Sequence, residues 1–285
     1  MAIGRAGGLL VLLAGALCAA TGAAADAERI VTLAPHLGEL VYDAGAGERL
    51  VGVIAFSDFP PEARELPRVG DAFGVKREVV AGLRPDLILA WDGFTPPATV
   101  ASLEEDGHRV VVIGARTPED VADALLAIAR LTGTEATARP AAERYRRALA
   151  ALADAHAAAR PIRVFVQLAA RPLYTVSDRQ MIGQVVRLCG GENVFGGLDG
   201  LTPVVGPEAV VAADPEVMLG TGDDGAADPW SRWREFPTLT AVAAGQLYAV
   251  NADHVTRPSL RLARGAAEIC DYLDRARAAG VPAAD

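Results

Sequence analysis

The sequence predicts an α/β protein in which two lobes with mostly parallel sheets are joined by one long helix. Short apolar runs alternate with helix-like segments along the chain, and this alternation is typical of parallel sheets covered by helices. Residues 135–159 keep Tyr145, Leu149 and Leu152 at helical spacing. A helix of about 24 residues would be roughly 36 Å long, enough to connect two lobes. The chain has 285 residues, 51% of them hydrophobic, which suffices for two cores.

In the first half of the chain, each expected strand is a dense apolar run. The expected strands are 30–33, 50–54, 86–91 and 109–113, and a helix is expected over 39–44. Thr117 and Pro118 predict the start of another helix, because threonine is a good N-cap and proline fits the first helical position. This helix should run to about Leu131 and end at Gly133.

The second half repeats this alternation. The expected strands are 162–168, 216–219 and 247–250, and the expected helices are 181–189, 208–213 and 260–279. Gly190 and Gly191 follow a helix, so they fit a C-cap and turn and not a dinucleotide-binding loop. The predicted organisation is a first lobe over 26–134, a linking helix over 135–160 and a second lobe over 161–285.

The first 25 residues fit a cleaved signal peptide. Arg5 supplies the positive start, residues 8–17 are apolar but too short to span a bilayer, and the alanines at 23–25 form a cleavage site. Export to the periplasm is therefore expected. The alternatives are an uncleaved anchor and a lipoprotein attached through Cys18, and Leu17 disfavours the lipoprotein because lipidation needs a small residue there.

Removal of the signal peptide would leave two cysteines, Cys189 and Cys270. An even number of cysteines in an exported chain predicts a disulfide. The alternative is a pair of buried, unpaired thiols.

Charge and motifs argue against several classes of function. The net charge is -9 and no cluster of basic residues forms a stripe, so no nucleic-acid partner is expected. No nucleophile, phosphate-binding or zinc-protease motif is present, so we expect a protein that is not an enzyme and needs no cofactor or metal. A metal-dependent α/β enzyme stays open as a remote alternative, since distant residues could converge. The histidines are isolated in sequence: His36, His108, His156 and His254.

The two halves contain a similar stretch. EVVAGLRPDLIL starts at Glu78 and EAVVAADPEVML starts at Glu208. In both, a glutamate stands seven residues before a proline, which is followed by an acid and an apolar strand. Helix, tight turn and strand form a common α/β unit, so the similarity alone assigns no function.

Five stretches together resemble the periplasmic cobalamin-binding receptors of ABC importers, a group within the corrinoid, haem and iron-siderophore receptors. They cover nearly the whole chain from about 29 to 275, and the fourth stretch with the later cysteine is the most specific to the cobalamin group. The stretches are RIVTLAPH (29–36), FSDFPPEA (56–63), LRPDLILAW (83–91), LCGGENVF (188–195) and RPSLRL (257–262).

The resemblance implies the class III periplasmic binding protein fold, with two Rossmann-like lobes on a rigid helix and a ligand in the cleft between them. Trp91 ends an expected strand, where ligands of open α/β sheets bind, and an aromatic face suits a flat corrin ring. The ligand-binding residues that the matching motifs imply are Phe56, Trp91 and Arg257, with Phe73, Leu168 and Tyr174 as weaker candidates. A monomer that needs little lobe closure is expected.

The resemblance also gives the paired glutamates a role. It implies that Glu78 and Glu208 each contact an arginine of the membrane permease, one from each lobe. An acid near a helix N-terminus, favourable with the helix dipole, is the plainer alternative.

One departure from the family concerns aromatic residues, which are only 5% of the chain. Thr202 stands where a cleft tryptophan is expected, and Trp230 and Trp233 fit packing better than ligand contact. A haem or ferric-siderophore ligand therefore stays open beside cobalamin.

Overall fold

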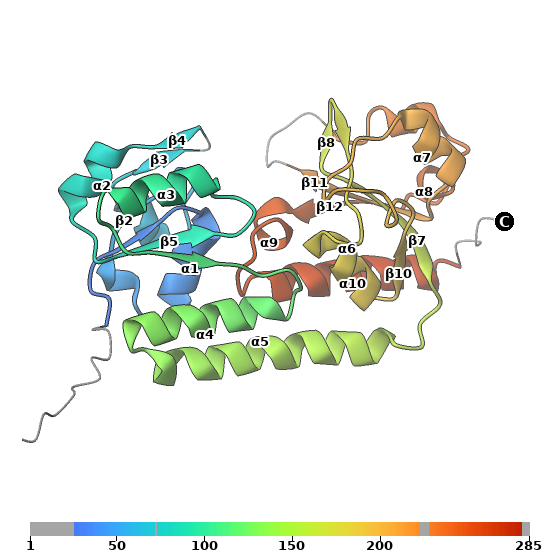
Figure 1. The fold of residues 1–285 in the computed structure, drawn as a ribbon. Helices are drawn as coiled ribbons and strands as arrows, with labels where there is room; N and C mark the ends of the chain where they lie inside the picture. The colour runs from blue at the N-terminus through green and yellow to red at the C-terminus, as the bar shows by residue number, and fades with distance from the viewer. Residues whose placement is uncertain (1–25, 72, 223–227, 281–285) are drawn as a thin grey trace, which may run out of the picture.

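The structure, a computed structural model, describes residues 26–71, 73–222 and 228–280 and contains two four-stranded parallel sheets. The strand order is β2-β1-β5-β6 in the first sheet and β10-β7-β11-β12 in the second. Figure 1 shows the sheets side by side, each with its own helices, above the pair α4 and α5. The predicted α/β class is confirmed. The predicted signal peptide lies outside the described residues.

The first sheet and its helices form the part that we call the N-lobe. β5 is buried at every residue, and its side chains alternate between two cores. Leu87 and Leu89 pack with α1 and α4, whereas Ile88 and Ala90 pack with α2 and α3. The strands are β1 (Ile30–Thr32), β2 (Leu50–Val53), β5 (Leu87–Trp91) and β6 (Val110–Ile113), and the helices are α1 (Pro35–Asp43), α2 (Arg77–Leu83), α3 (Pro97–Glu105) and α4 (Asp120–Thr132). A small hairpin adds β3 (Gly70–Asp71) and β4 (Gly74–Val75).

The second sheet and its helices form the C-lobe. Its central strand β7 buries Val164 and Val166 against α6 and α10, and Phe165 against Trp233 on the other face. The strands are β7 (Ile162–Gln167), β10 (Gly191–Asn193), β11 (Val217–Gly222) and β12 (Leu247–Asn251), with a hairpin of β8 (Ala169–Ala170) and β9 (Leu173–Tyr174). The helices are α6 (Met181–Leu188), α7 (Pro207–Ala213), α8 (Thr240–Ala243), α9 (Ala252–Val255) and α10 (Leu262–Ala278), and short 3-10 turns lie at 47–49, 61–65 and 233–235.

The linking helix is α5 (Glu135–His156), which runs antiparallel beside α4 along the lower side of both lobes in Figure 1. Tyr145 is buried and donates its hydroxyl hydrogen to the carbonyl oxygen of Pro118 at 2.7 Å. Arg146 pairs with Asp123 of α4 at 2.8 Å. The helix is therefore fixed to the N-lobe along its first half.

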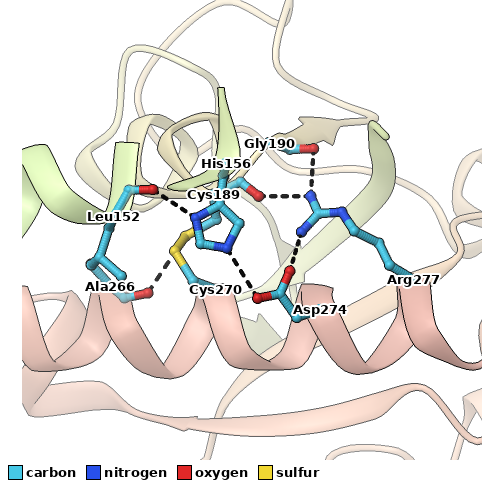
Figure 2. Close-up of a disulfide and its surroundings, with 8 residues drawn as sticks. All are labelled: Leu152, His156, Cys189, Gly190, Ala266, Cys270, Asp274 and Arg277. Atoms are coloured by element: carbon cyan, nitrogen blue, oxygen red, sulfur yellow. Dashed lines mark hydrogen bonds and ion pairs between the residues drawn. A yellow bond between two sulfur atoms is a disulfide. The ribbon is translucent and has the colours of Figure 1, made fainter. Parts of the chain in front are cut away.

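The predicted disulfide is present between Cys189 and Cys270, and it joins the end of α6 to α10. Figure 2 shows that α5 ends beside it, where His156 contacts the Leu152 carbonyl oxygen at 2.6 Å and the Asp274 carboxylate at 3.1 Å. The last turn of the linking helix, α6 and α10 thus meet at one place.

Three local predictions differ from the structure. The first helix begins at Pro35, four residues before the predicted start, because a proline at the first helical position follows the extended Ala34. α4 begins at Asp120, although Thr117 and Asp120 exchange side-chain and backbone hydrogen bonds of 3.2 and 2.9 Å, as in a capping box. Gly191, expected in a turn with Gly190, is the first residue of the edge strand β10.

Candidate functional site

A cleft of about 1050 Å³ lies between the lobes. Its walls come from the ends of β5 and β6 in the N-lobe, from α6 and the segment before it in the C-lobe, from Ala153 of α5, and from the segment between α9 and α10. The aromatic and charged residues that line it are His36, Trp91, Asp92, Phe94, Arg116, Glu119, Asp178, Arg179 and Arg187. Its volume matches the upper end of small-molecule pockets, roughly 1000 Å³.

Trp91 forms part of the N-lobe wall of the cleft. It is the last residue of β5, it is 6% exposed as part of the core, and its ring makes a T-shaped contact with His36, with centroids 4.2 Å apart at 83°. Burial, helped by the nearby Arg257, lowers the pKa of His36 to about 3, so the imidazole is neutral. His36 Nε2 is buried and has no hydrogen-bond partner among the described residues.

Charged side chains at the cleft form arginine–aspartate pairs. Arg116 lies 3.6 Å from Asp92, and Arg187 lies 2.6 Å from Asp178. Sequence reasoning did not single these residues out. Asp92 directly follows β5 and Arg116 closely follows β6, so the strand-end rule that pointed to Trp91 could have found both.

The other predicted aromatic residues of the N-lobe lie in exposed loops and do not line this cleft. Phe56 is 76% exposed, and its backbone has φ +64°, a strained value for a bulky residue. Phe73 is fully exposed beside the β3–β4 hairpin and donates its N–H to the Asp71 carboxylate at 2.8 Å.

Leu168 and Tyr174 of the C-lobe lie next to each other, because the Leu168 N–H donates to the Tyr174 carbonyl oxygen at 2.9 Å. Leu168 packs against the core and Tyr174 is 37% exposed. Neither lines the 1050 Å³ cleft. Figure 1 shows β8 on the upper side of the C-lobe and the β3–β4 hairpin on the upper side of the N-lobe.

Arg257 lies in a cluster of charged residues that connects the two lobes. It does not line the cleft itself, whereas its neighbours Thr256 and Pro258 do. Its guanidinium pairs with Asp58 of the N-lobe at 2.6 Å and with Asp253 at 2.9 Å. Its charge is therefore already matched within the protein.

Glu39 of α1 is at the centre of this cluster and is only 2% exposed. Its carboxylate accepts hydrogen bonds of 2.9 and 2.6 Å from Arg261 and a longer one of 3.3 Å from Arg257. The guanidinium of Arg261 also stacks over the Phe59 ring at 4.2 Å. This cluster connects the lobes a second time, independently of α5.

The paired glutamates are both exposed, each in the first turn of a seven-residue helix, α2 or α7. One residue of each helix is buried, Val80 in α2 and Val210 in α7, two positions after the glutamate. Figure 1 shows α2 and α7 on the side of their lobes that faces away from α5. The similar stretches in the sequence thus form equivalent elements.

Trp230 and Trp233 are buried in the C-lobe core, in agreement with the packing interpretation. The Trp233 indole donates to the Gln167 side chain at 2.7 Å.

Among residues 26–71, 73–222 and 228–280, no group of three or more His, Cys, Asp or Glu side chains could hold a metal ion. No helix formed by these residues has the length and apolar character needed to cross a membrane.

Comparison with known proteins places this two-lobed fold in a family. The model of the periplasmic binding protein family matches residues 30–253. The vitamin B12-binding protein of Vibrio cholerae serotype O1 is 35% identical over 249 residues, which are 87% of this chain and 89% of that protein. That of Pectobacterium atrosepticum is 35% identical over 259 residues, 89% of this chain and 91% of that protein.

Solved structures agree. The crystal structure of the periplasmic vitamin B12 binding protein BtuF of Vibrio cholerae matches with a TM-score of 0.80 and 34% identity, over 88% of this chain and 98% of that chain. The periplasmic heme-binding protein BhuT matches with a TM-score of 0.78 but 24% identity, over 88% and 99%, a likeness of fold alone. The chain belongs to the periplasmic binding protein family, and its fold is the class III fold of that family.

Proposed function

We propose that this protein captures cobalamin or a related corrinoid and delivers it to an ABC permease of the inner membrane. The observation that carries the proposal is the 35% identity, over 87% of the chain, to a vitamin B12-binding protein. It acts by binding and release, without catalysis. A haem or siderophore ligand is the weaker candidate, because the likeness to haem-binding proteins extends to the fold alone.

The size and chemistry of the cleft support this proposal. A volume of about 1050 Å³ suits a ligand at the large end of the small-molecule range, roughly 1000 Å³. Trp91 offers an apolar wall to a flat ring, and the paired arginines and aspartates offer donors and acceptors to amide groups at its edge.

The further ligand contacts are proposed at the upper edges of the lobes. Phe56 and Phe73 expose aromatic faces on the N-lobe, and Tyr174 and Leu168 form a partly exposed pair on the C-lobe. Arg257 would reach a ligand only by giving up part of its pairing with Asp58 or Asp253.

Titration of the mature protein with cyanocobalamin, cobinamide and haemin tests the ligand. Tryptophan fluorescence is a suitable signal, because Trp91 lines the cleft whereas Trp230 and Trp233 lie in the C-lobe core. Both corrinoids should quench at micromolar concentrations and haemin should not. Quenching by haemin alone would move the assignment to the second candidate.

We further propose that Glu78 and Glu208 meet basic residues of the permease, one glutamate from each lobe. The support is their exposure in matching first turns of α2 and α7. Reversal of both charges should abolish docking and leave corrinoid affinity within twofold. A loss of corrinoid affinity instead would argue that the pair acts in the cleft or the fold.

The remaining parts of the proposal concern the chain as a whole. We propose a signal peptide cleaved after residue 25, lobes over 26–134 and 161–285, a linking helix over 135–160, and a monomer in the periplasm. Mass spectrometry of the exported protein and light scattering test the cleavage site and the monomer.

A further inference from the structure

The C-terminal ends of α2 and α7 are held in the same way, although the two helices belong to different lobes. In the N-lobe, the guanidinium of Arg29 donates to the Leu83 carbonyl oxygen at 2.7 Å and to the Arg84 carbonyl oxygen at 3.2 Å. These are carbonyls at the end of α2, which have no partner within the helix. A cation is also favourable at this end of the helix dipole.

The C-lobe repeats this contact with Arg163 of β7. Its guanidinium donates to the carbonyl oxygen of Ala213, the last residue of α7. Leu83 and Ala213 occupy equivalent positions, since each lies five residues after the glutamate of its helix.

The same two arginines are fixed to the sheets through their backbones. The Arg29 N–H donates to the Asp86 carboxylate at 3.0 Å, and the Asp86 N–H donates back to the Arg29 carbonyl oxygen at 3.0 Å. Arg163 and Glu216 exchange the equivalent pair of hydrogen bonds, each of 2.9 Å. Asp86 and Glu216 each directly precede the strand that follows the helix, β5 or β11.

The rest of each helix makes a small number of tertiary contacts. A helix of seven residues is too short to be stable alone, so its direction depends on tertiary contacts. One buried valine fixes its middle and the arginine fixes its end. In α2, Arg77 also donates to the Asp106 carboxylate at 2.6 Å, next to Glu78. The exposed glutamate lies at the opposite end, two turns away at most.

We infer that Arg29 and Arg163 are positioning residues for permease docking. Each fixes the direction of a short helix, and the pair thereby fixes the distance and orientation between the carboxylates of Glu78 and Glu208. The inference rests on the docking role proposed above. An arginine that only stabilises its lobe is the alternative that the experiment must separate.

The experiment compares Arg29→Gln, Arg163→Gln and the double variant with the wild type in two assays. Docking is measured as binding of the ligand-loaded protein to the cognate vitamin B12 permease in lipid nanodiscs, and ligand affinity is measured with cyanocobalamin. The double variant should dock about tenfold more weakly, with ligand affinity within twofold of wild type. Arg29→Lys with Arg163→Lys should recover part of the docking, because an ammonium group still donates to the carbonyls.

Arg277→Gln is the matched control. Arg277 also donates to carbonyl oxygens at the end of a helix, those of Cys189 and Gly190 after α6, but that helix carries no docking glutamate. It should dock like the wild type. Equal loss of docking in this control, or full docking by the double glutamine variant, would overturn the inference.

Charge reversal at Glu78 and Glu208 separates the two levels of the proposal. Full docking after charge reversal would overturn the docking role itself and the inference with it. Loss of docking after charge reversal, together with full docking by the arginine variants, would overturn the inference alone.

Discussion

Substitution of Glu39 by glutamine should weaken the connection between the lobes. The side chain is 2% exposed, and its carboxylate accepts hydrogen bonds from Arg261 and Arg257. Glutamine keeps the volume but carries no charge and can accept at one oxygen only. The variant therefore leaves two guanidinium groups in a partly buried site with less negative charge to match them.

The cost follows from the contacts that are lost. Removal of one partner from a buried ion pair costs about 3–5 kcal/mol when the other charge is left unpaired. Arg257 keeps Asp58 at 2.6 Å and Asp253 at 2.9 Å, so only Arg261 loses its main partner. We therefore expect Glu39→Gln to lower the free energy of unfolding by about 2–3 kcal/mol.

Urea unfolding followed by circular dichroism measures this change. Glu143→Gln is the control, because Glu143 is exposed and pairs with Arg147 on the surface of α5, so this change should alter stability by less than about 0.5 kcal/mol. Equal stability of Glu39→Gln and this control would refute the argument that the cluster holds the lobes together.

Three further predictions concern the disulfide, a half-buried acid and the cleft wall. Replacement of Cys189 and Cys270 by serine should lower the free energy of unfolding by about 4 kcal/mol, because the disulfide closes a loop with a sequence separation of 81 and so reduces the entropy of the unfolded chain. A change below about 1 kcal/mol would contradict this argument. Burial, with a smaller contribution from the Glu39 carboxylate, raises the pKa of Asp43 to about 6. The folded protein therefore binds this proton more tightly than the unfolded chain does, and ionisation of Asp43 lowers the free energy of unfolding as the pH rises from about 4 to 6. Asp43→Asn should therefore be more stable than the wild type at pH 7, by at most about 3 kcal/mol, and this gain should vanish near pH 4. Urea titrations at several pH values measure the gain, and a gain that does not change with pH would exclude the raised pKa of Asp43 as its cause. Trp91→Phe should weaken cyanocobalamin binding about tenfold and remove most of the ligand-induced quenching, and unchanged quenching would exclude Trp91 from the site.

The elements with a dense local signal were predictable from the sequence. β5 is an apolar run buried at every residue, and α4 ends at Gly133, which adopts φ +64°. Glu78 and Glu208 stood out because the helix, turn and strand around them repeat. In contrast, β10 consists of Gly191, Glu192 and Asn193, which carry no apolar pattern, although it pairs with β7 at the sheet edge.

The cleft was predictable only in part. Trp91 was found because a rule about strand ends needs only local sequence. The environment of Arg257 could not be predicted, because its partner Glu39 lies 218 positions away and either charged residue alone looks like an ordinary surface residue. Such pairing depends on how the chain folds back from the C-lobe onto α1, which the local pattern of neither segment encodes.

Equilibrium dialysis of the mature protein against cyanocobalamin tests the central claim most directly. The cleft between the lobes has a volume of about 1050 Å³, the size of one large ligand, so we predict retention of one cyanocobalamin per chain, with half-saturation at micromolar concentration or below. Haemin at the same concentration should not displace it. The absence of retained cyanocobalamin at tens of micromolar would contradict the assignment of this protein as a corrinoid receptor.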